Sequence, residues 1–273
     1  MTALAPNGFL SIGGFDIEYR MIGPQPSQAP TIIMLHEGLG CVGLWGDFPD
    51  RLQAATGVGV LAYSRAGYGA SSPVALPRPL DYMQIEALQI LPELLDRIGF
   101  RRGLLLGHSD GASIAAIHAG GVADHRVRGV ALIAPHFVVE DVSVEAIAQI
   151  KQDYEATALR TRLQRWHRDV DNAFYGWNGA WLDPAFRHWD ISDHHAYIRV
   201  PIALLQGEAD QYGTIRQIEI ARQQCYCPLE VTLLPGIGHS PQREAPDATL
   251  GVISEFARRI LFDHDEGGYS PAA

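Results

Sequence analysis

Several short runs of apolar residues along the chain show no regular alternation with polar residues. Strands buried on both faces of a parallel sheet have this pattern, whereas half-exposed strands alternate. The pattern predicts buried strands at residues 31–35 and 103–106, and further strands at 59–63, 127–134, 200–206 and 229–234.

Stretches with apolar residues at helical spacing separate these runs. Helices are predicted at residues 45–55, 80–98, 112–120, 214–224 and 246–262. Residues 9–12 and 15–22 flank Gly13-Gly14 and are typical of a hairpin at the edge of a sheet. Strands that alternate with helices predict an α/β fold with a mostly parallel central sheet flanked by helices.

The 273 residues contain no repeat and no Pro/Ser-rich linker, which favours one domain with an insertion. We assign residues 1–135 and 199–273 to the core. Residues 136–198 contain no run of core-strand type and hold four tryptophans, Trp166, Trp177, Trp181 and Trp189. A helical lid insertion over the carboxyl edge of the sheet is the simplest interpretation. We expect the polar tail at 263–273 to be frayed.

Charge and composition narrow the range of partners. The formal net charge of −10 opposes binding to nucleic acid and to anionic membrane surfaces. No apolar run approaches the length of a membrane span, and the first residues lack the features of a signal peptide, so we expect a cytoplasmic protein. Cys41, Cys225 and Cys227 are too few for a metal site and are expected to be free thiols in a reducing compartment.

A histidine-rich stretch in the insertion raises the question of a metal site. His188, His194 and His195 occur together with Asp190 and Asp193, but no helical i, i+4 pairing organises them. We therefore expect them to be solvated or to pack within the lid, with no metal bound.

The sequence Gly107-His-Ser-Asp-Gly111 follows the buried run at 103–106 and precedes a small, Ala-rich helix. The order strand, tight turn, helix places Ser109 at the apex of the turn, with glycines where strand and helix pass close together. Its hydroxyl would then lie at a helix N-terminus, where the N–H of Asp110 can stabilise an oxyanion. Taken alone, the motif is equally compatible with an ordinary glycine-rich turn.

A serine nucleophile needs a base and a carboxylate that orients the base. Asp210 follows the predicted strand at 200–206, and His239 follows the last one, so both lie at the same sheet edge as Ser109. Alternatives stay open: Asp210 could cap the next helix, Glu208 is a competing carboxylate, and His239 could be a turn histidine.

The glycine-rich loop at 64–72 is interpreted as a structural turn.

Together, His36-Glu-Gly-Leu-Gly40, the Ser109 pentapeptide, Gly207-Glu-Ala-Asp210 and Gly238-His-Ser-Pro241 resemble the α/β-hydrolase superfamily over essentially the whole chain. The resemblance implies the α/β-hydrolase fold, with Ser109 as nucleophile, His239 as general base and acid, and Asp210 as its partner. It also implies an oxyanion hole from the backbone N–H groups of Gly38 and Asp110.

These features favour a serine hydrolase, carboxylesterase-like, that cleaves a small ester-like acyl substrate through an acyl-enzyme. We expect Glu37, Trp177 and Trp181 to line the substrate pocket. No cofactor is implied, the partner is a small molecule, and a homodimer is compatible with the sequence. Relatives with the same triad cleave carbon–carbon bonds of ring-fission products, form peracids or hydrolyse amides. A third possibility is a non-catalytic, ligand-binding protein on this scaffold.

Two acidic residues depart from the pattern of the superfamily. Glu37 stands where a glycine usually follows the histidine, and Asp110 follows the nucleophile, where apolar residues or glutamine are common. Two carboxylates near the scissile bond disfavour an anionic group beside it. An alternative is that both side chains point away as structural hydrogen-bond acceptors.

We therefore predict that neutral or cationic esters are better substrates than anionic ones. The measurement is kcat/KM for esters that differ only in a carboxylate on the acyl chain. A higher kcat/KM for the carboxylate-bearing ester would contradict the prediction.

Overall fold

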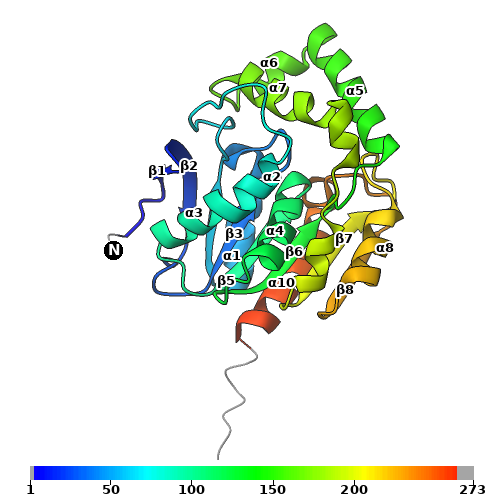
Figure 1. The fold of residues 1–273 in the computed structure, drawn as a ribbon. Helices are drawn as coiled ribbons and strands as arrows, with labels where there is room; N and C mark the ends of the chain where they lie inside the picture. Colours follow the sequence, from blue (N-terminus) through cyan, green and yellow to red (C-terminus); the bar gives the residue numbers. More distant parts are fainter. Residues whose placement is uncertain (1–2, 263–273) are drawn as a thin grey trace, which may run out of the picture.

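The computed structural model describes residues 3–262, and the predicted frayed tail lies outside this range. Eight strands form one sheet in the order β1-β2-β4-β3-β5-β6-β7-β8. β1 and β2 form the predicted hairpin at one edge, β2 pairs antiparallel with β4, and every other neighbouring pair is parallel (Figure 1). The strands are β1 (Asn7–Ile12), β2 (Phe15–Ile22), β3 (Thr31–Leu35), β4 (Gly59–Tyr63), β5 (Gly103–His108), β6 (Val127–Ile133), β7 (Ile202–Gly207) and β8 (Leu229–Leu234).

Helices connect these strands. Those of the core are η1 (Val42–Trp45), α1 (Phe48–Thr56), α2 (Tyr82–Ile85), η2 (Glu86–Ile90), α3 (Leu91–Arg97), α4 (Asp110–Gly121), α8 (Ile215–Gln224), α9 (Pro241–Glu244) and α10 (Pro246–Phe262). The segment between β6 and β7 adds α5 (Asp141–Ala156), α6 (Leu159–Leu163), α7 (Val170–Trp181), η3 (Pro184–His188) and η4 (Ser192–Tyr197). The predicted α/β-hydrolase fold is confirmed.

Two of the predicted helices are interrupted in the structure. The expected helix at 45–55 is a 3₁₀ turn followed by α1, because Gly46 adopts a left-handed φ of 61° and interrupts the helical backbone. The expected helix at 80–98 contains a π-helical turn, η2, between α2 and α3. Pro92 lies in the first turn of α3 and has no N–H for the α-helical hydrogen bond.

Both faces of the sheet are covered, which explains the absence of alternation in the central strands. On β3, Ile32 and Met34 pack on one side with α1 and α10. Ile33 and Leu35 pack on the other side, toward α3, α4 and α8. Each central strand thus buries its odd and even side chains against different helix layers.

The segment between β6 and β7 is helical, as predicted, and α5, α6 and α7 lie together at one end of the sheet (Figure 1). Its interior is aromatic: Tyr154 stacks on Phe174 with ring centroids 3.6 Å apart, and Trp181 packs against Phe186 at 5.1 Å. The Asp169 carboxylate accepts a hydrogen bond from the Asn172 N–H and caps α7. Among the described residues, no helix is long and apolar enough to cross a membrane.

In the histidine-rich stretch of the insertion, for which we expected no bound metal, His195 is fully buried. The ring of His195 meets the Phe137 ring edge-on with centroids 4.1 Å apart, and its Nδ1 lies 3.0 Å from the Ser192 carbonyl oxygen. Burial lowers the pKa of His195 to about 4. In the described part of the chain, no group of three or more His, Cys, Asp or Glu side chains is arranged to hold a metal ion.

We predict that His195 contributes to the pH dependence of stability. The folded-state pKa lies below the unfolded value, so the imidazole stabilises the fold above about pH 6.5, and this contribution is lost as the pH falls toward 4. Between pH 7.5 and pH 5 the unfolding free energy of the wild type should fall by about 2 kcal/mol more than that of His195→Asn, which keeps an amide donor near Ser192. Chemical denaturation at both pH values measures this. His188→Asn, at an exposed histidine, should behave as the wild type, and identical pH dependence in His195→Asn would contradict the prediction.

Candidate active site

Ser109 occupies the turn between β5 and α4 with φ 53° and ψ −120°, a backbone conformation that non-glycine residues rarely adopt. Its N–H donates to the Ile133 carbonyl on the neighbouring strand at 2.9 Å. Its own carbonyl accepts hydrogen bonds from the N–H groups of Ala112 and Ser113, at 2.9 and 3.0 Å. The surrounding hydrogen bonds therefore hold the serine in a strained conformation, as is common at functional sites.

The glycines on either side of Ser109 allow the backbones to approach closely. A Cβ at Gly107 would lie 2.2 Å from the Gly111 carbonyl oxygen, and a Cβ at Gly111 would lie 2.1 Å from that of Leu35. Real Cβ atoms do not approach backbone oxygens at these distances. The motif therefore needs glycine at both positions, for the steric reason that the sequence indicated.

The structure brings Ser109, His239 and Asp210 together. Ser109 Oγ lies 2.9 Å from His239 Nε2, and His239 Nδ1 lies 2.9 and 3.0 Å from the two carboxylate oxygens of Asp210. Asp210 also accepts hydrogen bonds from the N–H groups of Tyr212 and Gly213, at 2.8 and 3.2 Å. Burial alone would raise the pKa of Asp210, but the hydrogen bond from His239 and the other bonds hold it below its ordinary value.

The competing interpretations of Asp210 do not match its surroundings. The residue that caps α8 is Thr214, whose hydroxyl accepts a hydrogen bond from the Arg216 N–H at 3.1 Å. Glu208 is exposed to solvent. Asp210 is thus the carboxylate that faces His239.

A cavity of about 210 Å³ opens beside Ser109. It contains every residue that the sequence analysis assigned to an oxyanion hole or pocket, and its lining is Glu37, Gly38, Leu39, His108, Ser109, Asp110, His136, Ile147, Trp177, Trp181, Gln211, Tyr212, His239 and Ser240. As the first helical residue of α4, Asp110 keeps a backbone N–H without an intrahelical acceptor. A Cβ at Gly38 would lie 2.1 Å from Trp177 Nε1, so the loop after β3 packs directly against α7.

The Glu37 carboxylate is bound by basic groups at the cavity wall. One oxygen accepts a hydrogen bond from Arg243 Nη2 at 3.1 Å, and the other lies 3.5 Å from His108 Nδ1. Burial would raise the pKa of Glu37, but the interactions with His108 and Arg243 lower it well below its usual range.

The Asp110 carboxylate is buried and accepts hydrogen bonds from two aromatic side chains. The Tyr82 hydroxyl donates at 2.5 Å and Trp181 Nε1 donates at 3.2 Å. Burial raises the pKa of Asp110, although these hydrogen bonds and the charge of Arg65 oppose the shift. The carboxylates of Glu37 and Asp110 thus both accept hydrogen bonds from the protein, as expected if they are structural acceptors.

The 64–72 loop contributes a buried arginine whose role the sequence analysis missed. The Arg65 guanidinium donates to the carbonyl oxygens of His36 and Glu37, and the Arg65 N–H donates to His36 Nε2 at 3.0 Å. Arg65 thereby holds the backbone immediately before Gly38. Its position after β4, a sheet neighbour of β3, was a signal in the sequence that could have indicated this contact.

His136 and Tyr212 are among the cavity residues that were not predicted. His136 lies in the loop after β6, which ends at Ile133, and its ring lies 5.5 Å from the His239 ring and 5.0 Å from the Trp181 ring. The Tyr212 ring lies 4.7 Å from the His239 ring. The signal available in the sequence for His136 was its place shortly after a strand, at the carboxyl edge of the sheet.

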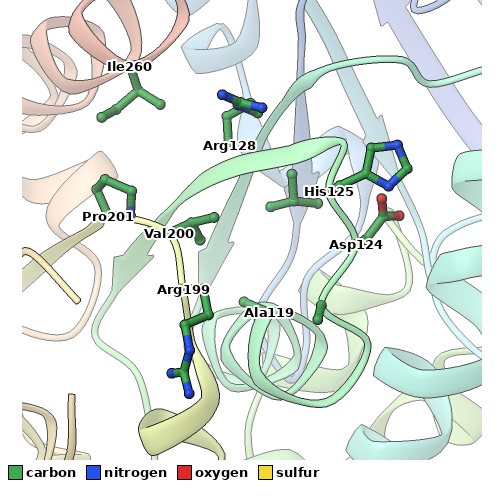
Figure 2. A pocket seen from close by; sticks show the side chains of 10 residues that line it. Ala119, Asp124, His125, Arg128, Arg199, Val200, Pro201 and Ile260 are labelled. Carbon is green, nitrogen blue, oxygen red and sulfur yellow. The ribbon is translucent and has the colours of Figure 1, made fainter. Parts of the chain in front are cut away.

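A larger cavity of about 360 Å³ lies at the other end of the sheet (Figure 2). Its lining includes Val127 and Arg128 at the start of β6, and Val200 and Pro201 just before β7. The amino ends of these strands are the edge opposite Ser109. The smaller cavity is therefore the candidate active site, despite its size.

Comparison with known proteins agrees with this architecture. The model of the alpha/beta hydrolase family matches residues 32–252. Proline iminopeptidase from Lactobacillus helveticus (strain DPC 4571) is 28% identical over 111 residues, which cover 41% of this chain and only 37% of the relative.

Solved structures of low sequence identity share the fold. A carboxylesterase of Nitrososphaera gargenis has a TM-score of 0.76 at 15% identity, over 93% of this chain and 99% of that chain. The enol-lactonase from Burkholderia xenovorans LB400 has a TM-score of 0.69 at 19% identity, over 91% and 98%. Since the family model spans the central strands, the Ser109 turn and the loops that carry Asp210 and His239, this chain belongs to the alpha/beta hydrolase family.

Proposed function

We propose that the protein is a serine hydrolase that cleaves a small, neutral ester through an acyl-enzyme intermediate. The observation that carries the proposal is the continuous hydrogen-bond chain from Ser109 Oγ through His239 to the Asp210 carboxylate. This arrangement supplies a hydroxyl with a base, and the base with a carboxylate that fixes its tautomer.

In the acylation step, His239 Nε2 takes the proton of Ser109 Oγ as the oxygen attacks the ester carbonyl carbon. Asp210 stabilises the imidazolium that forms. The backbone N–H groups of Asp110 and Gly38 are the proposed donors to the oxyanion. The carbon–oxygen bond of the ester then breaks, and the alcohol leaves with the proton from His239.

In the deacylation step, a water molecule replaces the alcohol. His239 removes a proton from the water as its oxygen attacks the acyl carbon, and the Ser109–acyl bond breaks. Ser109 Oγ recovers its proton from His239, and the carboxylic acid product leaves. Atoms and charges balance without a cofactor.

The shape and lining of the cavity favour a small substrate. About 210 Å³ is below the usual range for drug-sized ligands. Trp177 and Trp181 from α7, and Tyr212, give it aromatic walls that suit an apolar acyl or alcohol group. We propose that the segment at 136–198 acts as a lid that excludes water from the reacting ester.

A proline iminopeptidase activity is the second candidate, because a protein of that name is similar over part of the chain. A substrate with a free amine needs an anionic partner in the protein. The carboxylates of Glu37 and Asp110 line the cavity, but both are already engaged by protein donors. The ester is therefore the favoured substrate, and a chromogenic proline amide in the same assay separates the two activities.

We predict that Asp210→Asn lowers kcat for p-nitrophenyl acetate by roughly 10³- to 10⁴-fold, because the amide no longer holds His239 in the reactive tautomer. The matched control is Glu208→Gln, which removes a neighbouring carboxylate that is exposed and should leave kcat within about twofold. Steady-state kinetics of the two variants and the wild type measure the difference. Equal activity in all three proteins would exclude the proposed role of Asp210, and loss of activity in Glu208→Gln alone would assign that role to Glu208.

A further inference from the structure

His136 is a cavity residue that the proposed catalytic steps do not use. Its main chain is fixed by Ser113, whose hydroxyl donates to the His136 carbonyl at 2.6 Å and lies 3.2 Å from the His136 N–H. Its ring packs edge-on against the Trp181 ring and lies tilted beside the His239 ring. Only 3% of the residue is exposed, so protein atoms surround most of the imidazole.

The imidazole of His136 has no hydrogen-bond partner among the described residues. Nδ1 is fully enclosed and unpartnered. Buried polar atoms in native proteins are nearly always satisfied, so an enclosed imidazole without a hydrogen-bond partner requires an explanation. Because protein atoms enclose Nδ1 completely, Nε2 is the ring nitrogen that can face the cavity.

The surroundings determine which hydrogen bond Nε2 can make. Burial, and secondarily the charge of His239, lower the pKa of His136 to about 3, so the ring is neutral at any pH at which a serine hydrolase works. A buried N–H without an acceptor is less tolerated than an unused lone pair. The proton is therefore favoured on Nε2, which makes this nitrogen a hydrogen-bond donor into the cavity.

The matching ligand group is an acceptor oxygen without charge. A neutral imidazole offers no ion pair to a carboxylate, and the nearby carboxylates of Glu37 and Asp110 oppose a second anion. The aromatic wall beside His136 is Trp181, and its Nε1 already donates to Asp110, so a hydroxyl, ether or keto oxygen next to His136 finds no free donor on that wall.

We propose that His136 is a specificity residue whose Nε2–H hydrogen-bonds a second, neutral oxygen of the ester substrate, close to the scissile carbonyl. The inference rests on the proposed function and narrows it: the substrate is an oxygen-substituted small ester, such as a hydroxy ester or a keto ester. A site built to bond such an oxygen discriminates against an analogue that lacks it, because the imidazole donor is then left unpaired.

The test uses pairs of esters, the acyl pairs as phenyl esters, in which a hydroxyl replaces a methyl group of similar size. The acyl pairs are 3-hydroxybutanoate with 3-methylbutanoate and 2-hydroxypropanoate with 2-methylpropanoate, and 2-hydroxyethyl acetate with propyl acetate probes the alcohol side. The wild type should prefer the hydroxyl member of at least one pair by about 10- to 100-fold in kcat/KM. His136→Phe, which keeps an aromatic ring of similar size, should abolish this preference, and His136→Gln, which restores an amide donor, should recover part of it.

Control variants separate specificity from structural damage. His195→Asn changes another buried histidine outside the cavity and should keep the wild-type preference. Circular dichroism and thermal unfolding confirm that each variant is folded. If the wild type hydrolyses both members of every pair equally, or if His136→Phe keeps the preference, the inference is wrong while the proposed function stands. If the wild type hydrolyses no ester at all, the proposed function itself fails.

Discussion

The close contact of three backbones around Ser109 is the constraint on which the rest of the site depends. The end of β5, the first turn of α4 and the end of β3 meet where any Cβ at Gly107 or Gly111 would clash with a carbonyl oxygen. This contact accompanies the positive φ of Ser109, whose hydroxyl lies 2.9 Å from His239 Nε2. It also places the loop after β3, with Gly38, beside the helix N-terminus that Asp110 begins.

Charged and polar groups around this turn hold the neighbouring loop and helices in place. Arg65 holds the carbonyl groups before Gly38, and Arg243 holds the carboxylate of Glu37. The buried carboxylate of Asp110 connects Tyr82 of α2 to Trp181 of α7. Because Asp110 is adjacent to the nucleophile in sequence, the helical segment between β6 and β7 is tied directly to the turn. The depth of the cavity is therefore coupled to the position of α7.

Local patterns in the sequence were sufficient to predict the sheet. The runs at 31–35 and 229–234 coincide with β3 and β8. β3 is packed between helix layers and is buried throughout, whereas β8 lies at the sheet edge, contains polar residues and is only partly buried. The helix at 246–262 was also predicted with its correct ends. The π turn at Glu86–Ile90 and the short helix α9 were missed, because tertiary packing and Pro92 decide them rather than hydrophobic periodicity.

The sequence predicts which candidate site residues follow a strand, but not which atoms their side chains contact. Ser109, Asp210 and His239 each follow a strand, and a common sheet edge brings such residues together. Arg65 and His136 also follow strands, yet their importance depends on which atoms they meet: two carbonyl oxygens for Arg65, and no partner for the His136 imidazole. Only the folded structure contains that information.

Covalent labelling with a fluorophosphonate, followed by peptide mass spectrometry, tests the central claim most directly, because the reagent reacts with serines that a neighbouring base activates. We predict a single adduct on the peptide that contains Ser109 in the wild type, and none on this peptide in Ser109→Ala or in folded His239→Ala. An unlabelled Ser109 in the folded wild type, or a Ser109 adduct that forms equally fast in His239→Ala, would contradict the account.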